Sequence, residues 1–241
     1  MSKFNDEWVV QPHGELEKLD DGLFTVTGEI VMPLGRFPRR MTVVTLTNGR
    51  VAIWSPVPLA EPQMRQIEAL GRIAFLIVPG MGHRLDIKPW KARYPDAKVV
   101  CPPGAKAAVE EVIPVDAVGS VLRDPDVHLE TVPGVDEVEA YMRVMRGDRL
   151  TLVLNDIVAN VRHPHGLGAN IMARVLGFGV HHPETPKVGK KMFVKDAARL
   201  AGEMRTWADE PELTRIVVSH GDVIEEAPGG ALRMAAAGLT A

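Results

Sequence analysis

The spacing of apolar and polar positions changes several times along the chain. Between residues 16 and 54, short stretches alternate apolar with polar side chains, which is the pattern of half-buried antiparallel strands. The turn signals Asp21-Gly22 and Asn48-Gly49 separate these stretches. We therefore predict a β-meander over the first 55 residues, with strands at 16–22, 23–31, 41–46 and 51–54.

A helical spacing replaces the alternation at residues 61–70, where Met64, Ile67 and Leu70 share one stripe. The wholly apolar run 74–78 is typical of a strand buried on both faces. Further helices are predicted at 88–94, 105–112 and through most of 188–209, and further strands at 97–100, 127–131, 137–145, 150–154 and 216–218. Two β-rich halves, each followed by helix, predict two packed sheets with helices outside them, in one domain over residues 1–241.

Composition narrows the class of protein. Of the 241 residues, 46% are hydrophobic and 24% are charged, which is the balance of a soluble globular protein. The net charge of −3 gives no electrostatic argument for binding nucleic acid or an anionic membrane. Basic groups such as Arg36, Arg39 and Arg40 are predicted to be solvated surface, and contact with an anionic ligand is the alternative.

The one cysteine, Cys101, excludes an intramolecular disulfide and fits a reducing compartment. Its position after Val99-Val100 predicts a packed side chain at the end of a buried strand rather than a reactive thiol. The first residues lack the apolar segment of a signal peptide, and no apolar run has the roughly 18 residues that a membrane span needs. We expect a cytoplasmic protein that does not bind membranes.

Three apolar strands are followed by polar residues. His83 follows the run 75–78, Asp156 follows 152–154, and His220 follows 216–218. Strand ends in α/β architectures gather at one edge, where two imidazoles and a carboxylate could hold a divalent metal. Each residue also has a structural interpretation: a hydrogen-bonded histidine, or an aspartate that caps its own turn.

This layout resembles the metallo-β-lactamase superfamily over most of the chain. Residues 152–156 are similar to that family's strand leading to the bridging aspartate, and 217–221 to its last metal-binding histidine. Residues 78–86 occupy the place of its His-x-His-x-Asp-His loop, and 52–59 resemble a ligand-poor branch of the superfamily. The resemblance implies a four-layer αββα sandwich.

The family's ligand set is incomplete in this sequence. Met81 and Leu85 stand where the loop should have a histidine and the aspartate, and Val135 replaces the histidine of a Pro-Gly-His turn. Asp86 replaces the loop's last histidine and is a substitute ligand. The resemblance then implies at most one metal ion (zinc, manganese or iron), held by Asp86, Asp156 and His220, with or without His83.

For function, the resemblance implies a hydrolase in which metal-activated water attacks a small-molecule ester, thioester, lactone or phosphoester. Asp156 and His83 would be its catalytic residues. The alternative is a metal-free, inactive member that binds a small molecule or a partner protein, because apolar residues occupy three ligand positions. The sequence has no Gly-x-Ser-x-Gly elbow and no phosphate-binding glycine loop, which argues against a serine hydrolase or a nucleotide-binding enzyme.

Two other features remain open. Four histidines lie in Gly- and Pro-rich loops, where they are either surface residues or part of the pocket lining: His163, His165, His181 and His182. The apolar stretch 166–180 is a lid, the contact surface of a homodimer, or a buried helix.

Overall fold

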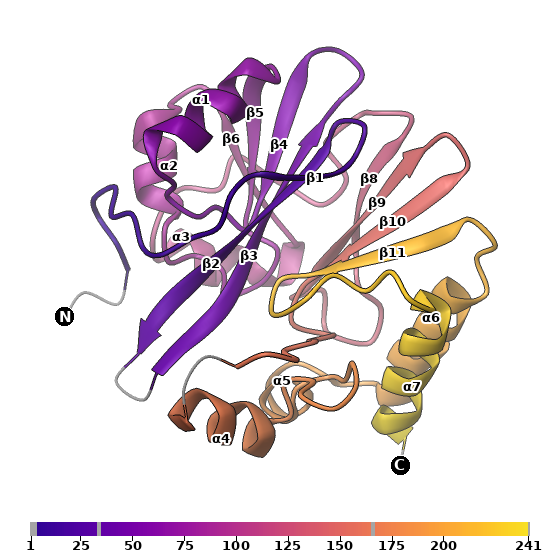
Figure 1. Ribbon diagram of the computed structural model, residues 1–241. Helices are drawn as coiled ribbons and strands as arrows, with labels where there is room; N and C mark the ends of the chain where they lie inside the picture. Colours follow the sequence, from indigo (N-terminus) through magenta and orange to yellow (C-terminus); the bar gives the residue numbers. More distant parts are fainter. Residues whose placement is uncertain (1–3, 33–34, 165–166, 241) are drawn as a thin grey trace.

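The computed structural model describes residues 4–32, 35–164 and 167–240, which form two sheets (Figure 1). The larger sheet has seven strands in sequence order: β1 (Glu17–Asp20), β2 (Leu23–Met32), β3 (Gly35–Thr45), β4 (Arg50–Trp54), β5 (Arg72–Ile77), β6 (Lys98–Cys101) and β7 (Ala117–Val118). Strands β1 to β4 pair antiparallel, whereas β4 to β7 pair parallel. The predicted meander at the start of the chain is therefore confirmed.

The smaller sheet has the strand order β11-β10-β9-β8. Its strands are β8 (Val127–Thr131), β9 (Ala140–Arg146), β10 (Arg149–Leu154) and β11 (Leu213–Val218). The first three strands pair antiparallel, and β11 joins β10 in parallel. Because β10 and β11 run in the same direction, the residues that follow them emerge at the same edge of the sheet.

Seven α-helices lie in the described part of the chain. They are α1 (Glu61–Ala69), α2 (Ile87–Arg93), α3 (Lys106–Glu110), α4 (Leu167–Leu176), α5 (Lys187–Met192), α6 (Ala197–Ala208) and α7 (Pro228–Thr240). A short 3₁₀ turn, Pro103–Ala105, precedes α3. No helix among the described residues is long and apolar enough to cross a membrane.

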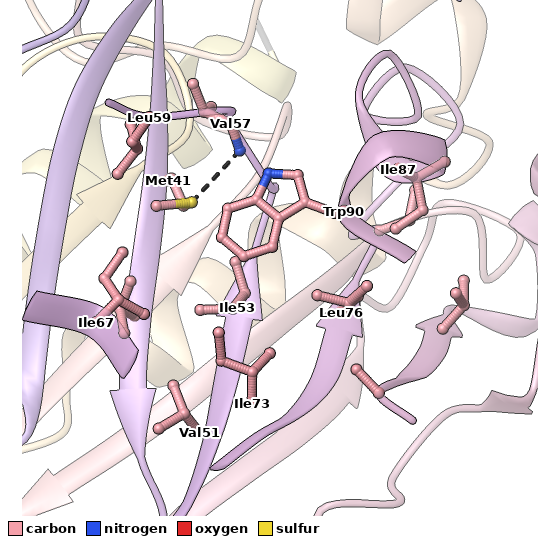
Figure 2. Close-up of a cluster of buried hydrophobic side chains, with 14 of the residues drawn as sticks. Met41, Val51, Ile53, Val57, Leu59, Ile67, Ile73, Leu76, Ile87 and Trp90 are labelled. Atoms are coloured by element: carbon pink, nitrogen blue, oxygen red, sulfur yellow. Dashed lines mark hydrogen bonds between the residues drawn. The ribbon is translucent and has the colours of Figure 1, made fainter. Parts of the chain in front are cut away.

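The outer face of the larger sheet packs against α1, α2 and α3. Figure 2 shows this core, in which Trp90 of α2 lies over Ile53 and Leu76 of the sheet. The Val57 amide donates to the sulfur of Met41 at 3.3 Å, which fixes the chain leaving β4 over β3. Complete burial of an aliphatic side chain such as Ile53 stabilises the fold by roughly 1.5–3 kcal/mol.

Because successive side chains of a strand point to opposite faces, each sheet contributes to two cores: one beneath its helices and one between the two sheets. In β4, Ile53 faces the helices, whereas its neighbour Trp54 packs between the two sheets. In β10, Val153 faces the larger sheet, whereas Leu152 and Leu154 pack outward with residues of α6 and α7. The result is four layers, helix–sheet–sheet–helix, with α4 and α5 beyond the lower ends of the sheets in Figure 1.

Most of 188–209 is helical, as predicted, but the helical residues fall in two segments, α5 and α6. Between them the Asp196 carboxylate accepts from the Arg199 amide at 2.9 Å and starts the second helix. The solvated-surface prediction is wrong for Arg39 and Arg40, which are both buried. Cys101 is packed as predicted.

Candidate metal centre

Three of the four predicted ligand residues converge. Asp156 and His220 follow the parallel neighbours β10 and β11, and His83 lies in the loop after β5 of the facing sheet. One ligand atom from each of these side chains lies within 4.8 Å of the other two. Among the described residues this is the one group of three histidine, cysteine or acidic side chains that is close enough to hold a metal ion.

Both imidazoles point at the same carboxylate oxygen. The Nε2 atom of His83 lies 3.2 Å from Oδ1 of Asp156, and Nε2 of His220 lies 3.1 Å from it. The other ring nitrogen of each histidine is also engaged. Nδ1 of His220 donates to the carbonyl of Pro38 at 2.8 Å, and Nδ1 of His83 lies 2.7 Å from the hydroxyl of Ser55. Such outer partners orient the ring and direct Nε2 inward.

Neighbouring charges shift the pKa values of Asp156 and His220. Burial opposes ionisation of Asp156, but the adjacent imidazoles of His83 and His220 outweigh it and hold the pKa of Asp156 well below its usual range. Burial likewise disfavours the charged form of His220, but the bond to Asp156 and its negative charge raise the pKa of His220 overall. The carboxylate therefore stays ionised and available as a ligand.

The turn that carries His220 is clamped from two sides. Gly221 has φ +110°, and a Cβ there would lie 2.1 Å from the carbonyl oxygen of Asn160. The Asn160 amide donates to the His220 carbonyl at 3.0 Å, and the guanidinium of Arg40 donates to the Gly221 carbonyl through Nε and Nη2. Only glycine allows the backbone to pass this close.

Glu139 is a neighbour of the site that sequence reasoning missed. The Asn155 side chain donates to it at 2.7 Å, and a Cβ at Gly80 would lie 2.2 Å from its Oε1. Burial and the negative charge of Asp156 raise the pKa of Glu139 well above its usual range. Its position immediately before the buried start of β9 is the signal that could have drawn attention to it.

Ser55 was also missed as a site residue, although it shares the pattern that identified the triad. It follows the apolar strand β4 at the same kind of strand end, and its φ of 54° is left-handed. The same rule applied to 51–54 would have placed Ser55 near His83.

Asp86, the fourth predicted ligand, is bonded to residues outside the triad. Its Oδ1 accepts from Asn5 at 2.6 Å, and its Oδ2 accepts from the guanidinium of Arg39 in a buried ion pair. Both carboxylate oxygens therefore already have partners, and Asp86 is not part of the converging group His83, Asp156 and His220.

Comparison with solved structures identifies the architecture. VMB-1 matches with a TM-score of 0.66 at 13% identity, over 94% of this chain and 98% of its own. The DIM-1 metallo-β-lactamase matches with a TM-score of 0.61 at 14% identity, over 94% of this chain and 99% of its own. FIM-1 from Pseudomonas aeruginosa, in its mono-zinc form, matches with a TM-score of 0.64 at 10% identity, over 95% of this chain and 96% of its own. The chain has the metallo-β-lactamase fold. Neither a scan of protein-family models nor a search of curated proteins finds a match for the sequence.

The resemblance places Val135 and Met81 at two of the family's ligand positions, and in this metallo-β-lactamase fold both side chains are packed against apolar neighbours. Val135 is fully buried in the core beneath α6, and Met81 packs against the core beneath α1 to α3. Thioether and aliphatic groups offer no ligand to a hard or borderline ion. The donor set is thus His-Asp-His, which could hold one metal ion.

Two cavities meet at the triad, and both are lined by Gly82, Asp156 and His220. The smaller cavity, about 110 Å³, is also lined by Arg39, Ser55 and His83 together with Ile30, Pro56 and Leu85, and we call it the polar cavity because it holds these three polar side chains. The apolar cavity, about 210 Å³, is bounded by side chains of β3, the loop after β5, and the segment 178–193: Phe37, Met81, Phe178, Val188, Met192 and Phe193. The triad therefore faces one cavity of mixed lining, the polar cavity, and one that is mostly apolar.

The remaining loop histidines do not join the triad. His163 is exposed and lies 3.1 Å from the Asp222 carboxylate, and His181 and His182 are exposed as well. His165 lies outside the described residues. Within 166–180, helix α4 exposes Ile171 and Val175, while Phe178 packs edge-on against Phe37 over the apolar cavity.

Proposed function

We propose that this protein is a hydrolase that uses one divalent metal ion held by His83, Asp156 and His220. The observation that carries the proposal is the convergence of three ligand atoms from two different sheets within 4.8 Å. The substrates proposed are small esters, thioesters, lactones or phosphoesters.

The spacing of the donor atoms fits a metal ion. Two ligand atoms that each lie about 2.0 Å from a tetrahedral centre are roughly 3.3 Å apart. The two Nε2–Oδ1 distances, 3.2 and 3.1 Å, are close to that value. Because Nδ1 of His220 must carry the hydrogen that it donates to Pro38, its Nε2 lone pair is free for a metal once the proton shared with Asp156 leaves.

A metal bound by these residues would supply Lewis-acid activation of water and of the substrate's polar bond. The chain itself would perform the positioning. Ser55 and Pro38 hold the two imidazoles, and the ionised Asp156 supplies the negative charge between them. The apolar cavity beside the triad would take the apolar part of a substrate and exclude water from it.

A second candidate is a metal-free protein that has kept the fold to bind a small molecule or a partner. The burial of Val135 and Met81 at positions that carry ligands in the complete family favours it, as does the direct contact of both imidazoles with Asp156. In that case the triad would be a buried hydrogen-bonded cluster.

Elemental analysis separates the two candidates. Protein purified without chelator or added metal should carry close to one equivalent of zinc, manganese or iron, and Asp156→Ala should carry none. Asp222→Asn is the matched control, because this carboxylate also contacts a histidine but lies outside the triad. A wild-type protein with no metal, and with no uptake on titration, would favour the metal-free candidate.

A further inference from the structure

The polar cavity has a buried cation in its wall. Arg39 is 5% exposed and follows Pro38, the residue that holds His220. Its cross-strand partner on β2 is Gly28, and the arginine side chain lies over the space that a larger residue would fill. The guanidinium therefore belongs to the site and not to the solvated surface.

Only part of the donor set of Arg39 is used. Nη1 donates to Asp86, whereas Nε and Nη2 are buried and have no hydrogen-bond partner among the described residues. Burial of donors without a partner is costly, and Arg39 also lines the polar cavity. We therefore take the unsatisfied pair as the donors for a group that binds there.

The two free nitrogens form one edge of the guanidinium. In this same chain, Arg149 uses those two atoms to hold both carboxylate oxygens of Asp20, at 2.9 and 2.7 Å. Parallel donors of this kind match the paired oxygens of a carboxylate or phosphate group. Asp86 does not compete for this edge, since its oxygens are occupied by Nη1 and by Asn5.

We infer that Arg39 is the anion-binding residue of the polar cavity, and that it receives a carboxylate or phosphate group through Nε and Nη2. The cavity that Arg39 lines also contacts His83, Asp156 and His220. If the function proposed above holds, the substrate is thus an anionic ester or acyl compound with its charged group on the Arg39 side and its apolar group on the Phe37 side.

The test measures anion binding to chelator-treated protein, so that a metal ion cannot be the receptor. Inorganic phosphate and acetate are titrated separately by calorimetry at constant ionic strength, which distinguishes the two anion classes. We expect one of them to bind with a stoichiometry near one. Arg39→Lys, which keeps the charge but loses the fork, should weaken it about tenfold.

A double substitution that removes both charges of the ion pair tests the inference with less risk that the variant fails to fold. Because Arg39→Gln alone would leave Asp86 buried without a counter-ion, the stronger variant is Arg39→Gln/Asp86→Asn. It should lose at least about tenfold in affinity. Arg36→Gln, an exposed arginine of the same strand, should bind like the wild type.

Two results would overturn the inference: no binding of either anion by the wild type at tens of millimolar, or unchanged affinity in the folded double variant. Because the measurement needs no metal, its failure is distinguishable from a failure of the metal analysis.

Discussion

His220 donates a hydrogen bond from Nδ1 to the backbone carbonyl of Pro38 at 2.8 Å, which ties the end of β11 in one sheet to β3 in the other. A carbonyl cannot donate, so this bond settles which ring nitrogen carries hydrogen. The remaining nitrogen faces Asp156. The orientation of a candidate ligand in the smaller sheet is thus determined by the backbone of the larger one.

Replacing His220 should abolish tight metal binding. We expect His220→Gln to lower zinc affinity by at least about 100-fold, since loss of only an outer hydrogen bond to a ligand typically costs 10–100-fold. Competition with a chromogenic chelator measures it. His163→Gln, which removes an exposed histidine that also contacts an aspartate, should keep wild-type affinity. Equal affinities in the two variants would contradict the ligand role.

Ser55 should matter in two separable ways. Its hydroxyl contacts Nδ1 of His83, so Ser55→Ala and Ser55→Gly should both lower zinc affinity about tenfold. Because φ is 54° at this position, Ser55→Gly should be about 1 kcal/mol more stable than Ser55→Ala in urea unfolding. Wild-type zinc affinity in both variants would show that the hydroxyl does not orient His83.

Gly221→Ala should destabilise the protein far more than an ordinary glycine substitution. The added methyl would meet the Asn160 carbonyl at 2.1 Å, and we expect a loss of at least about 3 kcal/mol in the free energy of unfolding. Gly49→Ala is the matched control: it also has positive φ, but nothing lies within 4 Å, so it should lose only about 1 kcal/mol. Similar losses in both would mean that backbone conformation alone sets the cost.

The bond between Asp20 and Arg149 should make stability depend on pH at the acid end. Hydrogen bonds from Arg149 lower the pKa of Asp20 to about 2. The unfolded value is near 3.9, so the stabilisation is complete above about pH 4 and is lost as the pH falls towards 2. Since solvent screens the pair, we expect Asp20→Asn to cost about 1 kcal/mol at pH 7 and almost nothing at pH 2.

Urea unfolding at several pH values measures this dependence. Asp21→Asn, at the neighbouring exposed carboxylate, is the control and should change stability little at either pH. An Asp20→Asn deficit that stays constant from pH 7 to pH 2 would contradict the ionic origin.

Cys101 should react slowly with thiol reagents in the native protein. Its side chain is fully buried at the end of β6, and burial raises the pKa of the thiol to about 11. Labelling with a disulfide reagent at pH 8 should therefore require unfolding and become fast in denaturant. Rapid native labelling would show that β6 opens locally.

Much of the fold followed from periodicity, because strands such as β4 alternate between two different cores and runs such as 74–78 are apolar throughout. The break between α5 and α6 escaped prediction because apolar spacing continues across it, and only the cap at Asp196 marks it. The site was predicted where a polar residue follows a buried strand. The ion pair between Arg39 and Asp86 escaped prediction because it joins residues 47 positions apart, which no local pattern encodes.

The triad draws its members from residues 83, 156 and 220, on two sheets that must already lie face to face. During synthesis, no metal can be captured in the native geometry until residue 220 has emerged and β11 has joined β10. A bound ion would then stabilise only the finished sandwich and none of its partly folded forms. Metal binding would therefore stabilise the protein only at the last stage of folding, and a chain whose synthesis stops before β11 would lack that stabilisation.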